Sequence, residues 1–534
     1  MSAHLLSRQG IVGDHSARID QLFSAYDRPS NPGVNLVVVH RGAVIHQRGY
    51  GVANVEDDVP FTAQTVLRLG STTKHLCATC LLMLEDRGLI GLDDDVRRVL
   101  PEVPDFGATI TLRHLLTMTS GLRDGLNLLL FAGMGAESPI SRAHVMRLLE
   151  RENTLMFAPG DDFSYSNTNY ALLSAVIERV AGGTIAQFME RELFAPLGMH
   201  QSALVPHMQA SIPHAARGYV PAGEGTWQQG LMKFELCGDG GVVSTLEDML
   251  RWFHHYRGDG GPRARLEAPT RLNDGRLVDY RLGINVARHD GLLEVSHAGG
   301  MPGFLCDFAF FPEEDLGIVL FANVLAPAIL EAPRHIARIA LARRTPHAGP
   351  PKYAPPRGFF ASRTENLLIE IVKVDGVWTC YLLGEAHELQ PVGDGTFASA
   401  KRGAVLTIRA GAGGVTLMLG CTSIAMEQVD VPRLRPEAPL ERYEGRFWSP
   451  VLRELHAVTA RDGRLEVAID SPLRDLVWKR FLPVAADLFT SQIDGEPSLT
   501  NVQIGFRRDA SGAVTGLAYN LARCRNVTFE RRLS

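Results

Sequence analysis

A serine and a lysine stand three residues apart in the stretch Gly-Ser-Thr-Thr-Lys, as Ser71 and Lys74. A hydroxyl is a weak nucleophile until a base takes its proton, and a lysine amine can act as that base. If the apolar run that follows is a helix, residues i and i+3 share one face, so the amine can reach the hydroxyl. The pair is also typical of a helix that Ser71 caps and in which Lys74 is solvated. Taken alone, this spacing favours the cap.

Two further short motifs carry groups that could take part in the same chemistry. Tyr165 and Asn167 precede an amphipathic helix, where a phenol near an ammonium can act as a base and a carboxamide can hold a lysine or a substrate amide. His297, Gly299 and Gly300 end an apparent strand. Glycines there let a substrate backbone approach, and the Gly300 N–H could donate to an oxyanion. Each motif by itself is equally typical of an ordinary turn.

In this order, the three motifs resemble those of the serine hydrolases of the penicillin-recognising fold, which include class C β-lactamases, D,D-peptidases, esterases and D-aminopeptidases. The resemblance continues through LRHLLTMTSGL, APGDDFSYSNTNYALL and GDGGVVSTLEDML, and it covers nearly all of the first 340 residues. It implies that Ser71 is the nucleophile and that Lys74 and Tyr165 share the role of the base, with no assignment between the two. It also implies an oxyanion hole from the N–H groups of Ser71 and Gly300, with Asn167 orienting the lysine.

The third motif departs from the β-lactamase pattern, because His297 stands where those enzymes have a lysine. A histidine is mostly neutral at pH 7 and binds a carboxylate less strongly than a permanent cation does. This difference weakens both a β-lactamase and a D,D-carboxypeptidase assignment.

The order of expected helices and strands around these residues predicts an α+β catalytic domain over residues 1–343. Strand patterns at residues 35–51 and 280–324 enclose a helical middle, so we expect one sheet built from both ends of the domain. Cys77 and Cys80 form a C-x-x-C within a helical pattern and are interpreted as core residues.

The remainder of the chain predicts two antiparallel β-barrels. Residues 344–356 are proline-rich and indicate a stiff linker. After the linker, GFFAS and IVKVDGVWTCYL are echoed in the same order by GRFWS and VTARDGRLEVAI. We therefore expect a duplicated module, one barrel at 357–432 and the other at 433–534, with an insertion, QIDGEPSLTN, in the second copy.

A penicillin-binding catalytic domain followed by two barrels is similar to the bacterial D-aminopeptidases, in which H-x-G replaces K-T-G. The resemblance implies that a loop of the last barrel, about 483–493 here, enters the cleft and that its acid, Asp487, binds the α-ammonium of the substrate. The first copy has Gly395 at the equivalent place, so the barrel itself does not require an acid. The alternative is that Asp487 is a solvated turn residue. His297 would line the leaving-group side, and Gly299 would give the substrate access.

The expected function is hydrolysis of an N-terminal D-residue, small such as D-Ala or Gly, from peptides, amides and esters through an acyl-enzyme. The substrate has a free amine, no metal or cofactor is required, and the resemblance implies a homodimer. The alternatives are a broad esterase or β-lactamase-like hydrolase and a catalytically silent binding protein.

Composition supports a soluble protein. The net charge of −5 is spread along the chain, which argues against nucleic acid or an anionic membrane as a partner. The N-terminus lacks the pattern of a secretory signal, and Asn323 and Pro327 interrupt the most apolar segment. Seven cysteines do not form a disulfide pattern. We therefore expect a cytoplasmic location.

Overall fold

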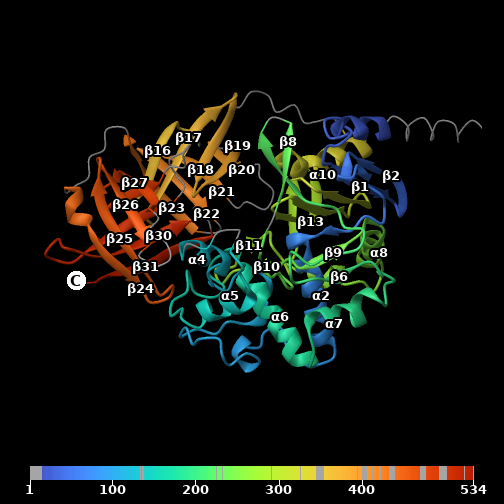
Figure 1. Cartoon of the computed structure of the whole chain (residues 1–534), viewed down its shortest axis with the longest axis horizontal. Coiled ribbons are helices and arrows are strands. Elements are labelled where there is room, and N and C mark those ends of the chain that lie inside the picture. Colours follow the sequence, from blue (N-terminus) through green and yellow to red (C-terminus); the bar gives the residue numbers. More distant parts are fainter. Residues whose placement is uncertain are drawn as a thin grey trace, which may run out of the picture.

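The chain folds into an N-terminal α+β domain and two closed β-barrels (Figure 1). Both the α+β prediction and the prediction of two barrels are confirmed. The computed structural model describes residues 15–532 except 133, 135–137, 224, 231, 290, 325, 344–353, 394, 400–405, 412, 420–421, 432–438, 470–476, 492–501 and 522. The predicted linker lies largely, and the insertion at 492–501 wholly, outside the described residues.

A six-stranded antiparallel sheet forms the centre of the N-terminal domain. Its order is β12-β13-β14-β15-β1-β2, so the first strand of the domain pairs with the last and the sheet is built from both ends, as expected. Its strands are β1 (Val34–His40), β2 (Ala43–Tyr50), β12 (Asn285–His289), β13 (Leu292–Met301), β14 (Phe304–Phe311) and β15 (Leu316–Ala322).

The sheet is buried on both faces because helices cover both. Side chains alternate along a strand, so Val37 of β1 joins the core around α8 (Leu246–Arg257), whereas Val38 joins the core around α10 (Pro327–Ala340). This double burial explains why β1 is a nearly continuous apolar run rather than an alternating one.

The helical middle of the domain packs against the first of these faces. Its two longest helices, α2 (Thr73–Asp86) and α6 (Asn167–Ala181), contact each other in the core. The other helices are α3 (Leu112–Leu116), α4 (Gly125–Phe131), α5 (Arg142–Leu149), α7 (Ile185–Met189) and α9 (Arg263–Leu266). The short strands are β3 (Val52–Asn54), β4 (Val59–Pro60), β5 (Leu67–Arg68), β6 (Ala203–Leu204), β7 (Tyr219–Gly223), β8 (Thr226–Gln229), β9 (Val242–Ser244), β10 (Thr270–Arg271) and β11 (Leu277–Val278).

Each barrel closes from eight antiparallel strands. The first contains β16 (Gly358–Ser362), β17 (Leu367–Val374), β18 (Val377–Leu382), β19 (Glu385–Gly393), β20 (Thr396–Ser399), β21 (Leu406–Gly411), β22 (Gly414–Leu419) and β23 (Thr422–Val429). The second contains β24 (Gly445–Ser449), β25 (Glu454–Arg461), β26 (Arg464–Ile469), β27 (Val477–Ala485), β28 (Leu488–Ser491), β29 (Gln503–Arg508), β30 (Val514–Leu521) and β31 (Cys524–Arg532). The echoed segments GFFAS and GRFWS are the opening strands β16 and β24, so the predicted duplication is confirmed.

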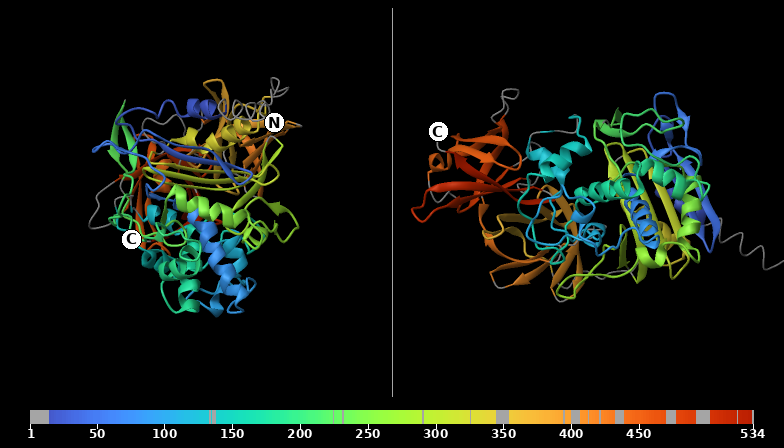
Figure 2. Two further views of the ribbon diagram at one scale, coloured as in Figure 1. Left: turned by 90° about the vertical axis from the view of Figure 1, so that its right-hand side faces the viewer. Right: turned by 90° about the horizontal axis from the view of Figure 1, so that it is seen from below.

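The barrels lie side by side at one end of the molecule (Figure 1, Figure 2). The second barrel shares an apolar core with α4 and α5, in which Leu129 and Leu148 pack with Tyr443 and Phe447. This contact fixes the barrel against the loops that precede α6.

Candidate active site

Ser71 lies in the single helical turn η1 (Gly70–Thr72) that leads into α2. Gly70 adopts a left-handed conformation, with φ of 53°. Gly299 of β13 packs directly against this turn, because a Cβ there would lie only 1.9 Å from the Leu69 carbonyl oxygen and 2.9 Å from the Ser71 nitrogen. Gly299 therefore lets the strand approach the serine. It is not among the described residues that line the adjacent cavity, whereas Gly300 is.

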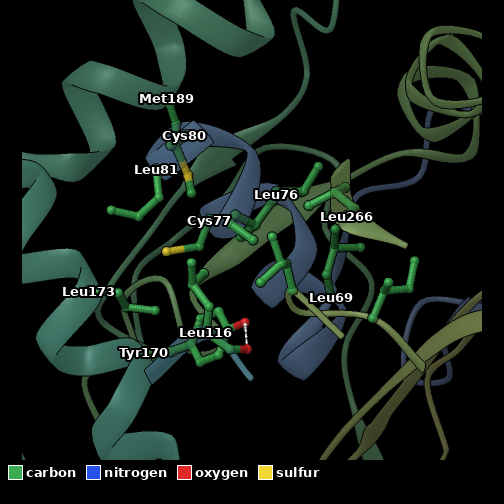
Figure 3. Close-up of a cluster of buried hydrophobic side chains, with 14 of the residues drawn as sticks. Leu69, Leu76, Cys77, Cys80, Leu81, Leu116, Tyr170, Leu173, Met189 and Leu266 are labelled. Carbon is green, nitrogen blue, oxygen red and sulfur yellow. Dashed lines mark hydrogen bonds between the residues drawn. The ribbon is translucent and has the colours of Figure 1, made fainter. Parts of the chain in front are cut away.

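The helix that carries the lysine is anchored in the core of the domain (Figure 3). Leu76, Cys77, Cys80 and Leu81 are fully buried, and Tyr170 of α6 closes the cluster by donating a hydrogen bond to the Leu116 carbonyl. Burial raises the pKa of the Cys77 and Cys80 thiols, so both behave as core residues, as predicted.

Lys74 is buried and points at the serine. Its Nζ donates hydrogen bonds to Ser71 Oγ at 3.1 Å, to Asn167 Oδ1 at 2.9 Å and to the Asp239 carbonyl oxygen at 2.5 Å. The ammonium also lies 4.9 Å from the ring centroid of Tyr165. The helical spacing of Ser71 and Lys74 thus produces the contact expected from the sequence.

Tyr165 and Asn167 reach the same point from the start of α6. The Tyr165 hydroxyl is buried and has no hydrogen-bond partner in the part of the chain that the structure describes. Asn167 is the first residue of α6, and its N–H donates to Asp124 Oδ2 at 2.7 Å. The Asp124 carboxylate therefore holds the helix start that presents the asparagine to Lys74. No sequence signal separated this aspartate from other loop acids.

His297 is buried on β13, and both of its ring nitrogens have partners. Its Nδ1 lies 2.8 Å from the Ala298 carbonyl oxygen, which can only accept, so Nδ1 carries a proton. Its Nε2 lies 3.1 Å from the hydroxyl oxygen of Tyr280, a phenol whose pKa burial raises. Sequence reasoning did not find Tyr280, which lies in a stretch without a motif.

A cavity of about 520 Å³ opens beside these groups, large enough for a small peptide. It brings together five of the predicted site residues: Ser71, Tyr165, Asn167, His297 and Gly300. Lys74 is buried behind the residues that line the cavity and contacts Ser71. Acyl transfer needs a nucleophile, a proton acceptor and backbone donors in one place, and this cavity supplies all three. Among the described residues, no group of acids, histidines and cysteines could hold a metal ion.

Asp487, predicted to bind the substrate ammonium, is not among the described residues that line this cavity, and its carboxylate is bound by neighbouring residues of the barrel. It occupies the turn between β27 and β28 and accepts hydrogen bonds from Tyr443 at 2.8 Å and from Arg508 at 2.8–3.0 Å. Its φ of 57° is left-handed, like the 71° of Gly395 in the first barrel. Aspartate tolerates this conformation better than most residues do, so the turn and the arginine account for it.

Replacing Asp487 by glycine should lower the free energy of unfolding by about 1–3 kcal/mol, because the partly buried Arg508 loses its carboxylate while the turn keeps its conformation. Denaturant unfolding measures this loss. Asp462 is a matched control, since it is an exposed turn aspartate with a φ of 49°. Its Asp462→Gly variant should be close to neutral. A changed preference between free-amine and acylated substrates in Asp487→Gly would contradict this structural role.

A different element of the second barrel reaches the cavity. Arg523, in the turn between β30 and β31, and Arg525 on β31 both line it. Arg525 Nη2 lies 3.6 Å from the buried carboxylate of Asp162. The last barrel thus lines the cavity with a different hairpin from the one that the sequence predicted, and with cations in place of an acid.

An α+β domain with Ser71, Lys74 and Tyr165 around one cavity has the arrangement of a penicillin-recognising serine hydrolase. Residues 19–342 match the family described as Beta-lactamase, and the chain belongs to this family.

Named relatives extend the similarity beyond this domain. A D-aminopeptidase of Cereibacter sphaeroides is 27% identical over 538 residues, which cover 96% of this chain and 99% of the relative. A D-aminopeptidase of Gluconobacter oxydans is 29% identical over 319 residues, 59% of this chain and 60% of that protein. The solved octameric penicillin-binding protein homologue from Pyrococcus abyssi shares the fold, with a TM-score of 0.55 and 22% identity over 78% of this chain and all of that one. In the described part of the chain, no helix is long and apolar enough to cross a membrane.

Proposed function

We propose that this protein is a serine aminopeptidase that hydrolyses the N-terminal D-residue of short peptides, amides and esters. The proposal is carried by the contact of Lys74 with Ser71 and Asn167 beside the cavity. It is supported by the similarity to the Cereibacter D-aminopeptidase, which spans both barrels as well as the first domain.

In the proposed mechanism, Ser71 Oγ attacks the carbonyl of the N-terminal residue and loses its proton to the Lys74 and Tyr165 pair. The N–H groups of Ser71 and Gly300 stabilise the tetrahedral oxyanion. Tyr165 returns a proton to the leaving amine, for which its unpartnered hydroxyl is suited. Water then hydrolyses the acyl-enzyme by the same route, and Asn167 keeps the Lys74 amine in place.

A free α-ammonium requires a carboxylate in the cavity, and Asp279 is the candidate that replaces Asp487. Asp279 lines the cavity, and its side chain is exposed there. In contrast to Asp487, no described residue forms an ion pair or a side-chain hydrogen bond with it; burial raises the pKa of its carboxyl, and the charge of nearby Arg281 acts in the opposite direction. A carboxylate that no direct ion pair occupies is suited to pair with an ammonium ligand.

The experiment is release of p-nitroaniline from D-Ala-, L-Ala- and N-acetyl-D-Ala-p-nitroanilide. The free D-compound should be cleaved, and the L- and acetylated compounds should react at least tenfold more slowly. Asp279→Asn should reduce the ratio between the rates at which the free and the acetylated D-compound are cleaved. Cleavage of the acetylated compound alone, or hydrolysis of simple esters only, would instead support the broad esterase or β-lactamase-like alternative.

We further propose that the enzyme is a cytoplasmic homodimer. The resemblance to bacterial D-aminopeptidases supports the dimer, whereas the Pyrococcus homologue is octameric. Light scattering coupled to size exclusion, and fractionation of expressing cells, test the two statements separately.

A further inference from the structure

The turn between β30 and β31 places a cation beside the candidate catalytic tyrosine. The guanidinium carbon of Arg523 lies 4.5 Å from the ring centroid of Tyr165. Lys74 Nζ lies 4.9 Å from the same centroid. The tyrosine ring therefore contacts one cation from the N-terminal domain and one from the second barrel, although their residues are more than 400 positions apart in the chain.

The hairpin is fixed in this position by contacts of the two residues that follow Arg523. The Cys524 thiol donates to the Asp124 carbonyl oxygen at 3.3 Å. The Arg525 carbonyl oxygen accepts from Arg123 Nε at 3.2 Å. Arg123 is itself buried and paired with the Glu152 carboxylate at 3.1 Å. These contacts hold the turn against the loop that precedes α6, so the position of Arg523 is part of the folded structure.

Arg523 differs from the other arginines of the cavity in its charge partners. Of the other arginines that line the cavity, Arg525 pairs with Asp162, and Arg334 pairs with Glu294 at 2.9 Å. Arg523 is exposed and has no carboxylate partner among the residues that the structure describes. A guanidinium that lines a cavity and has no carboxylate partner is suited to bind an anion there.

Lys74, the second cation beside the Tyr165 ring, makes the binding of an anion in the cavity more favourable. Lys74 donates to three neutral oxygens, those of Ser71, Asn167 and the Asp239 backbone. Because Lys74 and Arg523 both lie close to the same ring, their positive charges repel each other. An anion bound in the cavity would reduce this repulsion as well as pair with the guanidinium.

Both ring nitrogens of His297 already have partners, Nδ1 the Ala298 carbonyl oxygen and Nε2 the Tyr280 hydroxyl, so Arg523 is the better placed cation for this interaction. We propose that Arg523 forms a subsite for a carboxylate carried by the leaving group, and that the substrates are therefore short D-peptides, dipeptides foremost, with a free C-terminal carboxylate. This inference rests on the proposed function, and it names the substrate class.

The covalent geometry of a dipeptide fits this subsite. In the proposed mechanism the leaving amine receives its proton from Tyr165, so its nitrogen must lie beside the tyrosine. The carboxylate carbon of that leaving residue is only about 2.5 Å from its nitrogen, across one Cα. A guanidinium that lies against the Tyr165 ring is therefore within reach of the carboxylate, whereas an anilide or an amidated peptide offers it no charge.

The experiment compares D-Ala-Gly with its C-terminal amide, D-Ala-Gly-NH₂, as substrates of the full-length enzyme. The wild type should prefer the free acid. Arg523→Gln should lower kcat/KM for the acid by about 10- to 100-fold, mainly through KM, and for the amide by less than about threefold. Arg523→Lys should restore part of the preference. Arg464→Gln removes an exposed arginine on β26 of the same barrel and should leave both substrates unaffected.

Three results would overturn the subsite. Equal losses on the acid and the amide in Arg523→Gln, or a shifted pH profile for the amide, would show that the arginine acts on Tyr165 rather than on the substrate. An unchanged preference for the acid in Arg523→Gln would show that another group binds the carboxylate.

Failure of the proposed function is distinguishable from failure of the subsite. If no D-alanine derivative is cleaved, the aminopeptidase proposal fails, and the subsite is then tested with phenyl acetate and 3-carboxyphenyl acetate. These esters differ only in a carboxylate on the leaving group and need no ammonium site. A preference for the carboxylated ester that Arg523→Gln abolishes would retain the subsite, and the absence of such a preference would reject it.

Discussion

Replacing Ser71 by alanine should lower kcat/KM on D-Ala-p-nitroanilide by about 10⁴-fold or more, because the covalent step loses its nucleophile. The stability of the protein should change little. Ser71 Oγ receives one hydrogen bond, from Lys74, and a single such bond contributes on the order of 1 kcal/mol. Steady-state rates and the thermal midpoint measure the two quantities on one preparation.

A covalent label provides the control for this variant. A phosphonate ester should add one equivalent of mass to the wild-type chain, located on the peptide that contains Ser71, and none to Ser71→Ala. Turnover within tenfold of wild type, or labelling of a different serine, would remove Ser71 from the nucleophilic role even if the fold is intact.

Replacing Lys74 by methionine should lower kcat by about 10²- to 10⁴-fold, the range expected when proton transfer loses its acceptor. Methionine preserves most of the side-chain volume, so the core around α2 stays filled. The ammonium is buried, and its removal leaves Asn167 Oδ1 and the Asp239 carbonyl oxygen without their donor. A water in the cavity can satisfy the first of these, so we expect a folded but slow enzyme.

The matched control is Lys373→Met, which removes an exposed lysine on β17 of the first barrel. It should have wild-type kcat. A Lys74→Met enzyme with a rate loss below tenfold would show that Tyr165 alone accepts the serine proton, and the pH dependence of kcat would then report the phenol.

Local spacing explains which parts of the site could be predicted. Ser71 and Lys74 are one helical turn apart, so any helix over these residues brings their side chains together. Tyr165 and Asn167 are only two residues apart at the start of α6, so one short segment places both of them. These short-range relations do not depend on how the domains pack.

The contacts of Asp487, in contrast, could not be predicted from local spacing. A turn aspartate in a duplicated barrel can bind a ligand or a neighbouring strand, and the choice depends on which strand lies beside it. The register of β28 with β29 and the hydrogen bond from the Phe506 N–H to the Asp487 carbonyl oxygen place Arg508 within reach. This arginine is 21 residues further along the chain, and its approach is not a local property of the sequence.

The sequence by itself determined the class of fold and the duplicated barrels, and it predicted the nucleophile with its basic partners, because all of these follow from periodicity and from short motifs. Only the tertiary structure decided which barrel hairpin lines the cavity, that Arg523 lies against Tyr165, and that Tyr280 meets His297. The physical reason is that these contacts join segments whose separation is bridged by packing and by buried charges, and no local pattern encodes that packing.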